Sequence, residues 1–358
     1  MKRILYCAST VSHINKFHLD YIKALCDSGC EVKVLASGKE ADFNIPFEKR
    51  IWSFKNLVCI RKIRKILLEN HFDCLILNTA LAAFCVRAAV KRGNRPKIIN
   101  TVHGYLFSKN SGRVRSLLFF LCERAQRHKT DAIITMNAED YRSATRFGLT
   151  DGRVYRTRGM GGKIRAQISN PENLRAEYAR ESSFIMTFVG ELSRRKNQEF
   201  LIRALPSIRD KLPTVLLWLV GDGDEREHLG NLSRELGVSD IVVFLGERRD
   251  ACDFIRASDL YVTSASVEGL PLNLIEALGA GKTILASRIK GHEDVIADSV
   301  DGFLYDFGNM HEFVNKTCQI YDKNLEIDRK NIEEKYKIYE KERVLPDTLA
   351  VIRESLEL

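Results

Sequence analysis

The sequence predicts an α/β protein made of two doubly wound, parallel-sheet domains. Short apolar runs alternate with segments of helical periodicity from end to end, a pattern typical of parallel sheets covered by helices on both faces. The chain has 358 residues, of which 45% are hydrophobic, so it can form two domain cores. Ligands of such sheets bind at the carboxyl ends of the strands, so we expect a cleft between the domains.

Apolar runs of strand length mark the two sheets in turn. In the first half, strands are expected at residues 3–8, 31–36, 73–78, 97–102, 131–136 and 153–157. The first helix ends at Gly29, a typical helix stop. In the second half, strands are expected at residues 183–189, 214–220, 241–245, 259–263, 283–286 and 302–305.

The segment 158–182 is rich in glycine and polar residues and interrupts this alternation. We place the domain boundary within it, which predicts a first domain over 1–165 and a second over 166–335. A charged segment of helical period then predicts a C-terminal helix over 336–358.

The composition indicates a basic protein of the reducing cytosol. Net charge is +9, with basic clusters at Lys49–Arg50, 61–65, Lys91–Arg92 and 113–129. Such clusters attract nucleic acid, anionic lipid or phosphorylated ligands, or are simply solvated helix faces, and no nucleic-acid module is visible. The nine cysteines form no Cys-x-x-Cys pair, which predicts reduced, buried thiols. No run approaches the roughly 20 apolar residues that cross a bilayer, and the N-terminus is expected to be a first strand rather than a signal peptide.

An acidic loop followed by a helix start is the most informative segment. Glu268 follows an apolar strand, and Pro271 stands near the first helical position, where a proline favours a helix start. The free N–H groups of Leu272, Asn273 and Leu274 would then form a phosphate site at the positive end of the helix dipole.

Two carboxylates accompany that phosphate site. Glu268 can reach a group beside the anion, and Glu276, about one turn further along the helix, can accept hydrogen bonds from a diol. Phosphate, sugar and ribose together indicate a nucleotide-sugar ligand. The alternative is an ordinary αβ unit with two surface glutamates.

A second strand end carries the cations Arg194, Arg195 and Lys196. Arginine can fork onto a diphosphate, and lysine can act on it as a point charge. The alternative is a solvated basic loop. Asp222 and Asp224 end another strand, but their place inside the second domain argues against a metal pair, so we expect no metal.

Histidines follow two strands of the first domain. His103 closes the strand 97–102, and Gly104 lets another group approach the backbone closely. Ser12 and His13 follow the first strand and offer polar contacts. A lone histidine at a strand end is more often structural.

The string Ser264, Glu268, Gly269, Leu270, Pro271, Glu276, Ala277 and Gly281 resembles the Glu-x7-Glu motif of retaining glycosyltransferases of family 4. These have the GT-B fold, with two Rossmann-like domains facing a central cleft and a last helix that returns towards the first domain. The segment 188–197 is similar to the family's Gly-Arg-Leu-x-x-x-Lys-Gly loop. Lys196 matches its lysine, whereas Glu191 replaces the usual arginine and leaves Arg194 and Arg195 as candidates. The Gly-Glu-Leu sequence of this loop resembles the corresponding loop in the branch of the family that builds exopolysaccharide, capsule and lipopolysaccharide.

The resemblance implies a role for each candidate residue. Glu268 and His103 would lie at the reacting sugar, and Glu276 would hold the ribose. The donor diphosphate would meet Lys196, Arg195 or Arg194, and the helix start at Leu272, Asn273 and Leu274. The nucleobase would lie beside Gly246, Glu247 and Arg248, and the sugar or acceptor beside His13, Ser12, Gly104, Gly269 and Leu270.

The implied reaction moves a sugar from a nucleoside-diphosphate sugar, expected to be a UDP-sugar, with retention and without a metal or cofactor. The expected acceptor is a lipid-linked saccharide such as a polyprenyl-diphosphate sugar, at the cytoplasmic face of the membrane. The helix over 113–128 is apolar with basic flanks and could lie on anionic lipid or be a core helix. Two alternatives remain, a nucleotide-sugar epimerase of the same fold and a non-catalytic partner of a transferase, the latter favoured by Glu191.

Overall fold

The computed structural model describes residues 1–48, 53–91, 93, 95–107, 113–162, 167–180 and 183–356. These residues form two compact units, one comprising Met1–Gly161 with Lys341–Leu358 and the other Gly162–Glu340. The boundary expected at 165, the cluster Lys49–Arg50 and residue Arg92 lie outside the described residues.

The first unit is built on a seven-stranded parallel sheet in the order β3-β2-β1-β4-β5-β6-β7. Its strands are β1 (Arg3–Thr10), β2 (Glu31–Ser37), β3 (Phe43–Asn44), β4 (Cys74–Leu77), β5 (Lys97–Val102), β6 (Ala132–Thr135) and β7 (Arg153–Arg156). All four residues of β4 are buried, as in strands covered on both faces.

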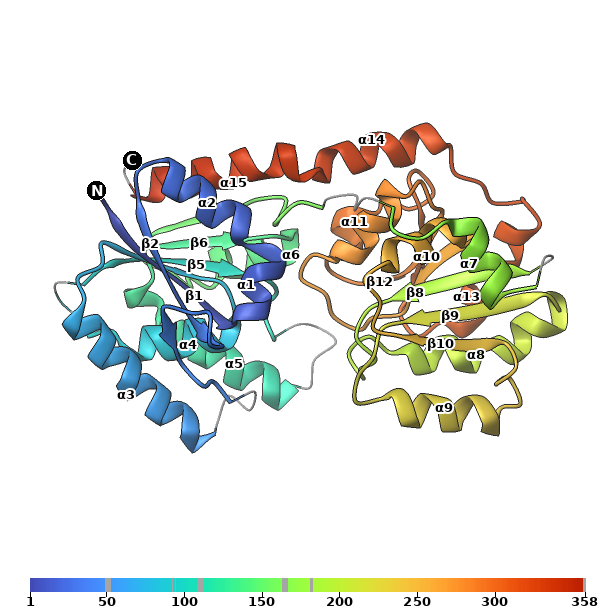
Figure 1. Ribbon diagram of the computed structural model, residues 1–358, viewed down its shortest axis with the longest axis horizontal. Helices are drawn as coiled ribbons and strands as arrows, with labels where there is room; N and C mark the ends of the chain where they lie inside the picture. The colour runs from blue at the N-terminus through green and yellow to red at the C-terminus, as the bar shows by residue number, and fades with distance from the viewer. Residues whose placement is uncertain are drawn as a thin grey trace. The chain divides into compact units, whose positions relative to one another are not determined.

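Helices cover both faces of this sheet (Figure 1). They are α1 (Val11–Phe17), α2 (Leu19–Asp27), α3 (Phe54–Glu69), α4 (Ala80–Ala89), α5 (Arg113–Ala125), α6 (Ala138–Arg146) and α15 (Lys341–Leu356), with a short 3-10 turn at Arg127–Lys129. Residues of α3 and α4 form one core with β1 and β4. The last helix, α15, packs on α2 and β5.

The second unit is built on a six-stranded parallel sheet in the order β10-β9-β8-β11-β12-β13. The strands are β8 (Phe184–Val189), β9 (Val215–Val220), β10 (Val242–Gly246), β11 (Leu260–Thr263), β12 (Ile284–Arg288) and β13 (Phe303–Asp306). The helices are α7 (Pro171–Tyr178), α8 (Gln198–Lys211), α9 (Arg226–Glu235), α10 (Ala251–Ala257), α11 (Leu272–Gly279), α12 (His292–Val295), α13 (Met310–Tyr321) and α14 (Arg329–Tyr339).

The expected α/β class and the two parallel sheets are confirmed. Each expected strand is present, and β3 at the sheet edge is the one the sequence analysis did not predict. The first strand is two residues longer than expected, because β1 continues to Thr10, whose hydroxyl caps α1 by accepting from the His13 N–H at 3.2 Å. The nine cysteines are all unpaired and most are buried. Among the described residues no helix is both long and apolar enough to cross a membrane.

Candidate active site

Two loops at the carboxyl ends of neighbouring strands form the centre of the site in the second unit. The loop after β8 carries Lys196, and the loop after β11 carries Glu268. The Ser264 hydroxyl donates to the Asn197 carbonyl at 2.7 Å, and the Ser266 N–H donates to the Arg195 carbonyl at 2.9 Å. These bonds fix the two loops to each other, so their charged side chains are held at short range.

Glu268 pairs with two of the three predicted cations. Its Oε1 lies 2.5 Å from Lys196 Nζ and 3.0 Å from Arg195 Nη1. Glu268 and Lys196 are buried, with exposed fractions of 8% and 9%. Burial alone would raise the pKa of Glu268, but the charges of Lys196 and Arg195 outweigh burial and lower it. The carboxylate is therefore ionised at neutral pH.

Arg194 does not belong to this cluster. Its guanidinium pairs with Glu225 at 3.2 Å, and its side chain is 91% exposed. Of the two candidate arginines, Arg195 is thus the one beside Lys196. Glu191 is exposed, and its carbonyl accepts from the Gln198 amide at 2.7 Å, so the backbone of this position supports the loop.

The start of α11 differs from the expectation in one respect. The Leu274 N–H already donates to the Pro271 carbonyl at 3.1 Å, so the prediction that it is free needs correction. The first helical turn uses that group internally. The Asn273 side chain donates to the Val189 carbonyl at 2.8 Å, which fixes the helix start to the end of β8.

Glu276 and Glu268 both act electrostatically on the hydroxyl of Tyr261. Burial raises the pKa of Tyr261, and the charges of Glu276 and Glu268 add to the rise. Gly269 and Leu270 continue the loop from Glu268 to α11. The two carboxylates of the motif therefore belong to one local arrangement.

Gly291 and His292 lie next to the Glu268 loop. A Cβ at Gly291, where φ is +83°, would lie 2.8 Å from the Gly269 carbonyl oxygen and 3.0 Å from that of Glu268. His292 is fully buried, its Nδ1 lies 2.8 Å from the Ser287 carbonyl, and burial lowers its pKa to about 4. Neither residue was among the predicted site residues.

The residues predicted beside the nucleobase follow β10. Gly246 accepts from the Gly221 N–H at 2.8 Å, and Glu247 is exposed. Two guanidinium nitrogens of Arg248, Nε and Nη2, donate to the Asp250 carboxylate at 2.8 Å, and the guanidinium lies 5.0 Å from the centre of the Phe254 ring. Arg248 is therefore held in place by residues of its own unit.

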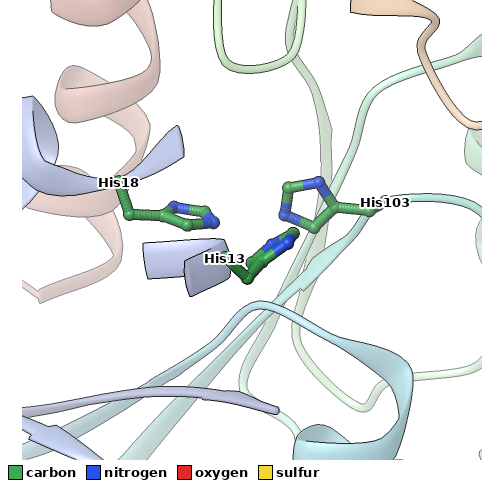
Figure 2. Close-up of side chains that lie close together, drawn as sticks. All are labelled: His13, His18 and His103. Atoms are coloured by element: carbon green, nitrogen blue, oxygen red, sulfur yellow. The ribbon is translucent and has the colours of Figure 1, made fainter. Parts of the chain in front are cut away.

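In the first unit, α1 and the end of β5 bring three histidines together (Figure 2). His13 and His103 were predicted site residues, whereas His18 was missed. The ring centres lie 5.3 Å apart for His13–His103, 5.5 Å for His18–His103 and 5.0 Å for His13–His18. The repeated histidine in the segment 13–18 was the sequence signal that could have identified His18.

A polar residue, Ser12, and a mainly apolar cavity lie next to the histidines. Ser12 is exposed on α1, and Gly104 has a φ of +127° that favours glycine. A mainly apolar cavity of about 230 Å³ lies beside His103 and Gly104, between α4 and α5. Burial lowers the pKa of His103 to about 3 and that of His13 to about 4, so both rings are neutral at physiological pH.

Comparisons with known proteins agree with the division of the chain into two units. Residues 15–156 match the family described as Glycosyltransferase Family 4, and residues 170–338 match Glycosyl transferases group 1. The UDP-Gal:alpha-D-GlcNAc-diphosphoundecaprenol alpha-1,3-galactosyltransferase of Escherichia coli is 24% identical over 88% of this chain and 84% of its own. Anabaena HepE, solved in complex with UDP, superposes with a TM-score of 0.73 at 20% identity, covering 99% of this chain and all of HepE.

The chain is more similar to EpsD of Bacillus subtilis, which is named as a glycosyltransferase. The two sequences are 31% identical, and the match covers 90% of this chain and 88% of EpsD. With both domains matched and the two-sheet fold in place, the chain belongs to the GT-B glycosyltransferases that combine a family 4 domain with a group 1 domain.

Proposed function

We propose that the protein transfers a sugar from a UDP-sugar, with retention of configuration, to a lipid-linked saccharide in bacterial surface polysaccharide assembly. The proposal includes no metal in the chemical step. The observation that carries it is the buried pair of Glu268 and Lys196, with the more exposed Arg195 on the same carboxylate oxygen, just before the start of α11.

The cluster suits a departing diphosphate. Negative charge grows on the diphosphate as the glycosidic bond breaks, and fixed cations in a buried site stabilise it. Lys196 and Arg195 supply those cations, with the helix dipole of α11 behind them. An ionised Glu268 is an acceptor for sugar hydroxyls rather than a proton donor, and in this proposal Glu276 accepts from the ribose.

The choice of donor and acceptor is supported by relatives. The E. coli galactosyltransferase is named for a UDP-sugar donor and a diphosphoundecaprenol-linked acceptor, and HepE was solved with UDP. EpsD and this chain share most of their length. We extend the donor and acceptor classes to this chain on that basis.

Surface chemistry of the first unit supports a membrane-bound acceptor. On α3, Phe54 is 86% exposed and Leu57 53% exposed, and Arg61 and Lys62 are exposed on the same helix. On α5, four apolar side chains are exposed, namely Val114, Leu117, Leu118 and Leu121, so α5 is not simply a core helix. Exposed apolar groups next to cations suit the surface of an anionic membrane.

Both helices belong to the same layer of that unit. Helix α3 packs on α4, and Arg87 of α4 pairs with Glu123 of α5 at 2.9 Å. The cavity beside His103 lies between α4 and α5. We therefore propose that the protein binds the inner leaflet peripherally through this layer.

The test of the reaction is a donor and acceptor panel in EDTA. UDP-, GDP- and ADP-sugars are incubated with and without polyprenyl-diphosphate-sugar acceptors, and free nucleoside diphosphate and product are quantified. We expect UDP release only with acceptor, and NMR of the product should show the donor's anomeric configuration.

Other outcomes of the same assay identify the alternatives. Donor conversion without any acceptor would indicate an epimerase. Donor binding without turnover over a broad acceptor panel would indicate a non-catalytic partner. An absolute requirement for a divalent ion would disprove the metal-free step.

The membrane proposal has its own test. In flotation with anionic liposomes at low salt, the wild type should float, and Arg61→Glu with Lys62→Glu should reduce the floating fraction. Arg203→Glu with Lys211→Glu on α8 of the second unit is the control, since it makes the same change in net charge at exposed residues of another helix. Wild-type protein that stays entirely in the soluble fraction would contradict the proposal.

A further inference from the structure

The three histidines of the first unit form a set of ligand atoms that the proposed reaction does not require. One nitrogen from each of His13, His18 and His103 lies within 4.8 Å of the other two. In the part of the chain that the structure describes, it is the one group of three or more such side chains within binding reach. The rings come from separate elements, with His13 on α1, His18 between α1 and α2, and His103 after β5.

The nitrogens that face the centre have no hydrogen-bond partner. The Nε2 atoms of all three histidines are buried and unpartnered, and His18 is fully buried. Figure 2 shows the rings turned towards one another. An unpartnered polar atom in a buried site is costly, so three at one point indicate that a ligand is accommodated there.

An outer hydrogen bond fixes one of these rings. Nδ1 of His18 lies 2.9 Å from the hydroxyl of the buried Tyr6. When His18 donates its Nδ1–H to that oxygen, the Nε2 lone pair faces the other two rings. Metal-bound histidines commonly have such a bond on their second nitrogen.

The charged groups around the histidines bear on whether a cation is tolerated there. The charged groups that act on the cluster are Lys16, near His13, and Lys341, near His18. Lys341 is itself paired with Asp20, which reduces its repulsion of a cation.

We propose that His13, His18 and His103 form a binding site for a borderline transition-metal ion such as Zn²⁺. Neutral imidazole nitrogens are ligands that Zn²⁺ prefers, and a set of three leaves a fourth position for water or a substrate oxygen. Zn–N bonds of about 2.0–2.1 Å require nitrogens about 3.4 Å apart in a tetrahedral site. Small ring rotations would bring the three nitrogens from within 4.8 Å to that spacing.

The site has a consequence for the reaction, which rests on the proposed function. His13 and His103 are the side chains placed at the sugar and acceptor. An ion bound to both withdraws them from substrate, so it inhibits transfer, whereas the chemical step itself proceeds in EDTA. Metal availability would thereby regulate the enzyme.

The test measures binding independently of turnover. Chelator-treated protein is titrated with Zn²⁺ by calorimetry and with Co²⁺ by visible absorption. We expect one ion per chain, with the absorption bands of four-coordinate Co²⁺. His13→Gln should weaken binding by at least tenfold, and Tyr6→Phe by roughly 10–100-fold through loss of the outer hydrogen bond.

Controls separate a lost ligand from a lost fold. His311→Gln changes an exposed histidine of α13 in the second unit and should leave binding unchanged. Because His13 is only partly buried, its glutamine variant should keep the wild-type circular dichroism spectrum. No stoichiometric binding, or binding that His13→Gln leaves intact, would overturn the site. Binding with no inhibition of transfer would overturn the regulatory step alone, and a protein without transferase activity would still report on the site.

Discussion

In the second unit, the loops after β8 and β11 bring a buried carboxylate and two cations together, whereas in the first unit α1 and the end of β5 bring together three uncharged imidazoles. Both groups lie at the carboxyl ends of strands in parallel sheets. The charged cluster is stable because opposite charges compensate each other's burial. In the histidine cluster, burial instead keeps the rings uncharged.

The difference indicates a division of labour. A site of fixed charges suits a ligand whose charge changes during reaction, such as a departing diphosphate. A neutral site with open nitrogen atoms suits hydroxyls or a metal ion. The following predictions are ordered from the largest expected effect to the smallest.

Lys196→Ala should have the largest effect on transfer. Removing one fixed group that stabilises transition-state charge costs about 10²–10³ in kcat. The substitution also leaves Glu268 buried with Arg195 alone, so the unfolding free energy should fall. In Lys196→Ala/Glu268→Gln the unfolding free energy should partly recover, because the unpaired carboxylate is gone. Steady-state kinetics and urea unfolding check both points, and equal stability of the single and double variants would contradict the pairing.

Two neighbouring arginines provide a matched test of the charged cluster. Arg195→Ala should reduce kcat by about tenfold or more, since its cation shares the Glu268 oxygen with Lys196 and, in the proposed reaction, would act on the same diphosphate. Arg194→Ala should change kcat only slightly, because exposed ion pairs such as Arg194–Glu225 contribute about 0–1 kcal/mol. Equal losses in the two variants would show that the cluster was assigned to the wrong arginine.

Gly291→Ala should destabilise the Glu268 loop. Its Cβ would collide with the Gly269 and Glu268 carbonyls, and we expect a loss of about 1–3 kcal/mol from crowding beyond the backbone strain. Gly237→Ala is the control, because φ is +65° there and nothing lies within 4 Å of the added Cβ. Chemical denaturation should rank Gly291→Ala as the less stable variant, and the reverse order would refute the contact.

The histidine cluster should make the first unit sensitive to acid. His103 has a pKa of about 3 when folded, against an ordinary value of 6.5, so between these values the unfolded chain binds a proton that the folded chain does not. Its contribution to stability is present above pH 6.5 and is lost as pH falls towards 3, by at most about 1.4 kcal/mol per pH unit. His103→Gln should flatten the fall in unfolding free energy between pH 7 and 4. An unchanged slope would show that His103 is not held neutral by folding.

Sequence periodicity was sufficient for the sheets. Runs such as Cys74–Leu77 are apolar throughout because both of their faces are covered, so each long strand could be predicted. The edge strand β3 has two residues, too few to show any period.

Side-chain pairing was harder to predict. The sequence indicated that Glu268, Lys196 and an arginine share a site, but Arg194 and Arg195 differ only in the direction their side chains take from one loop. His18 was missed because His103 is distant in sequence and meets it only through the order of strands in the sheet. The prediction of a free N–H at Leu274 was wrong because of a local detail. That N–H already donates to the Pro271 carbonyl within the first helical turn.

The division of the first unit between the two ends of the chain affects how the protein is synthesised. The sheet of this unit is complete by residue 156, but α15, which packs on α2 and β5, begins at Lys341. Domains generally begin to fold on the ribosome in the order in which they emerge. The first unit therefore cannot finish folding until the last helix has been synthesised. Until then, the surface that α15 covers is exposed to solvent or chaperone. The second unit is continuous in sequence and can finish folding earlier, although its translation begins later.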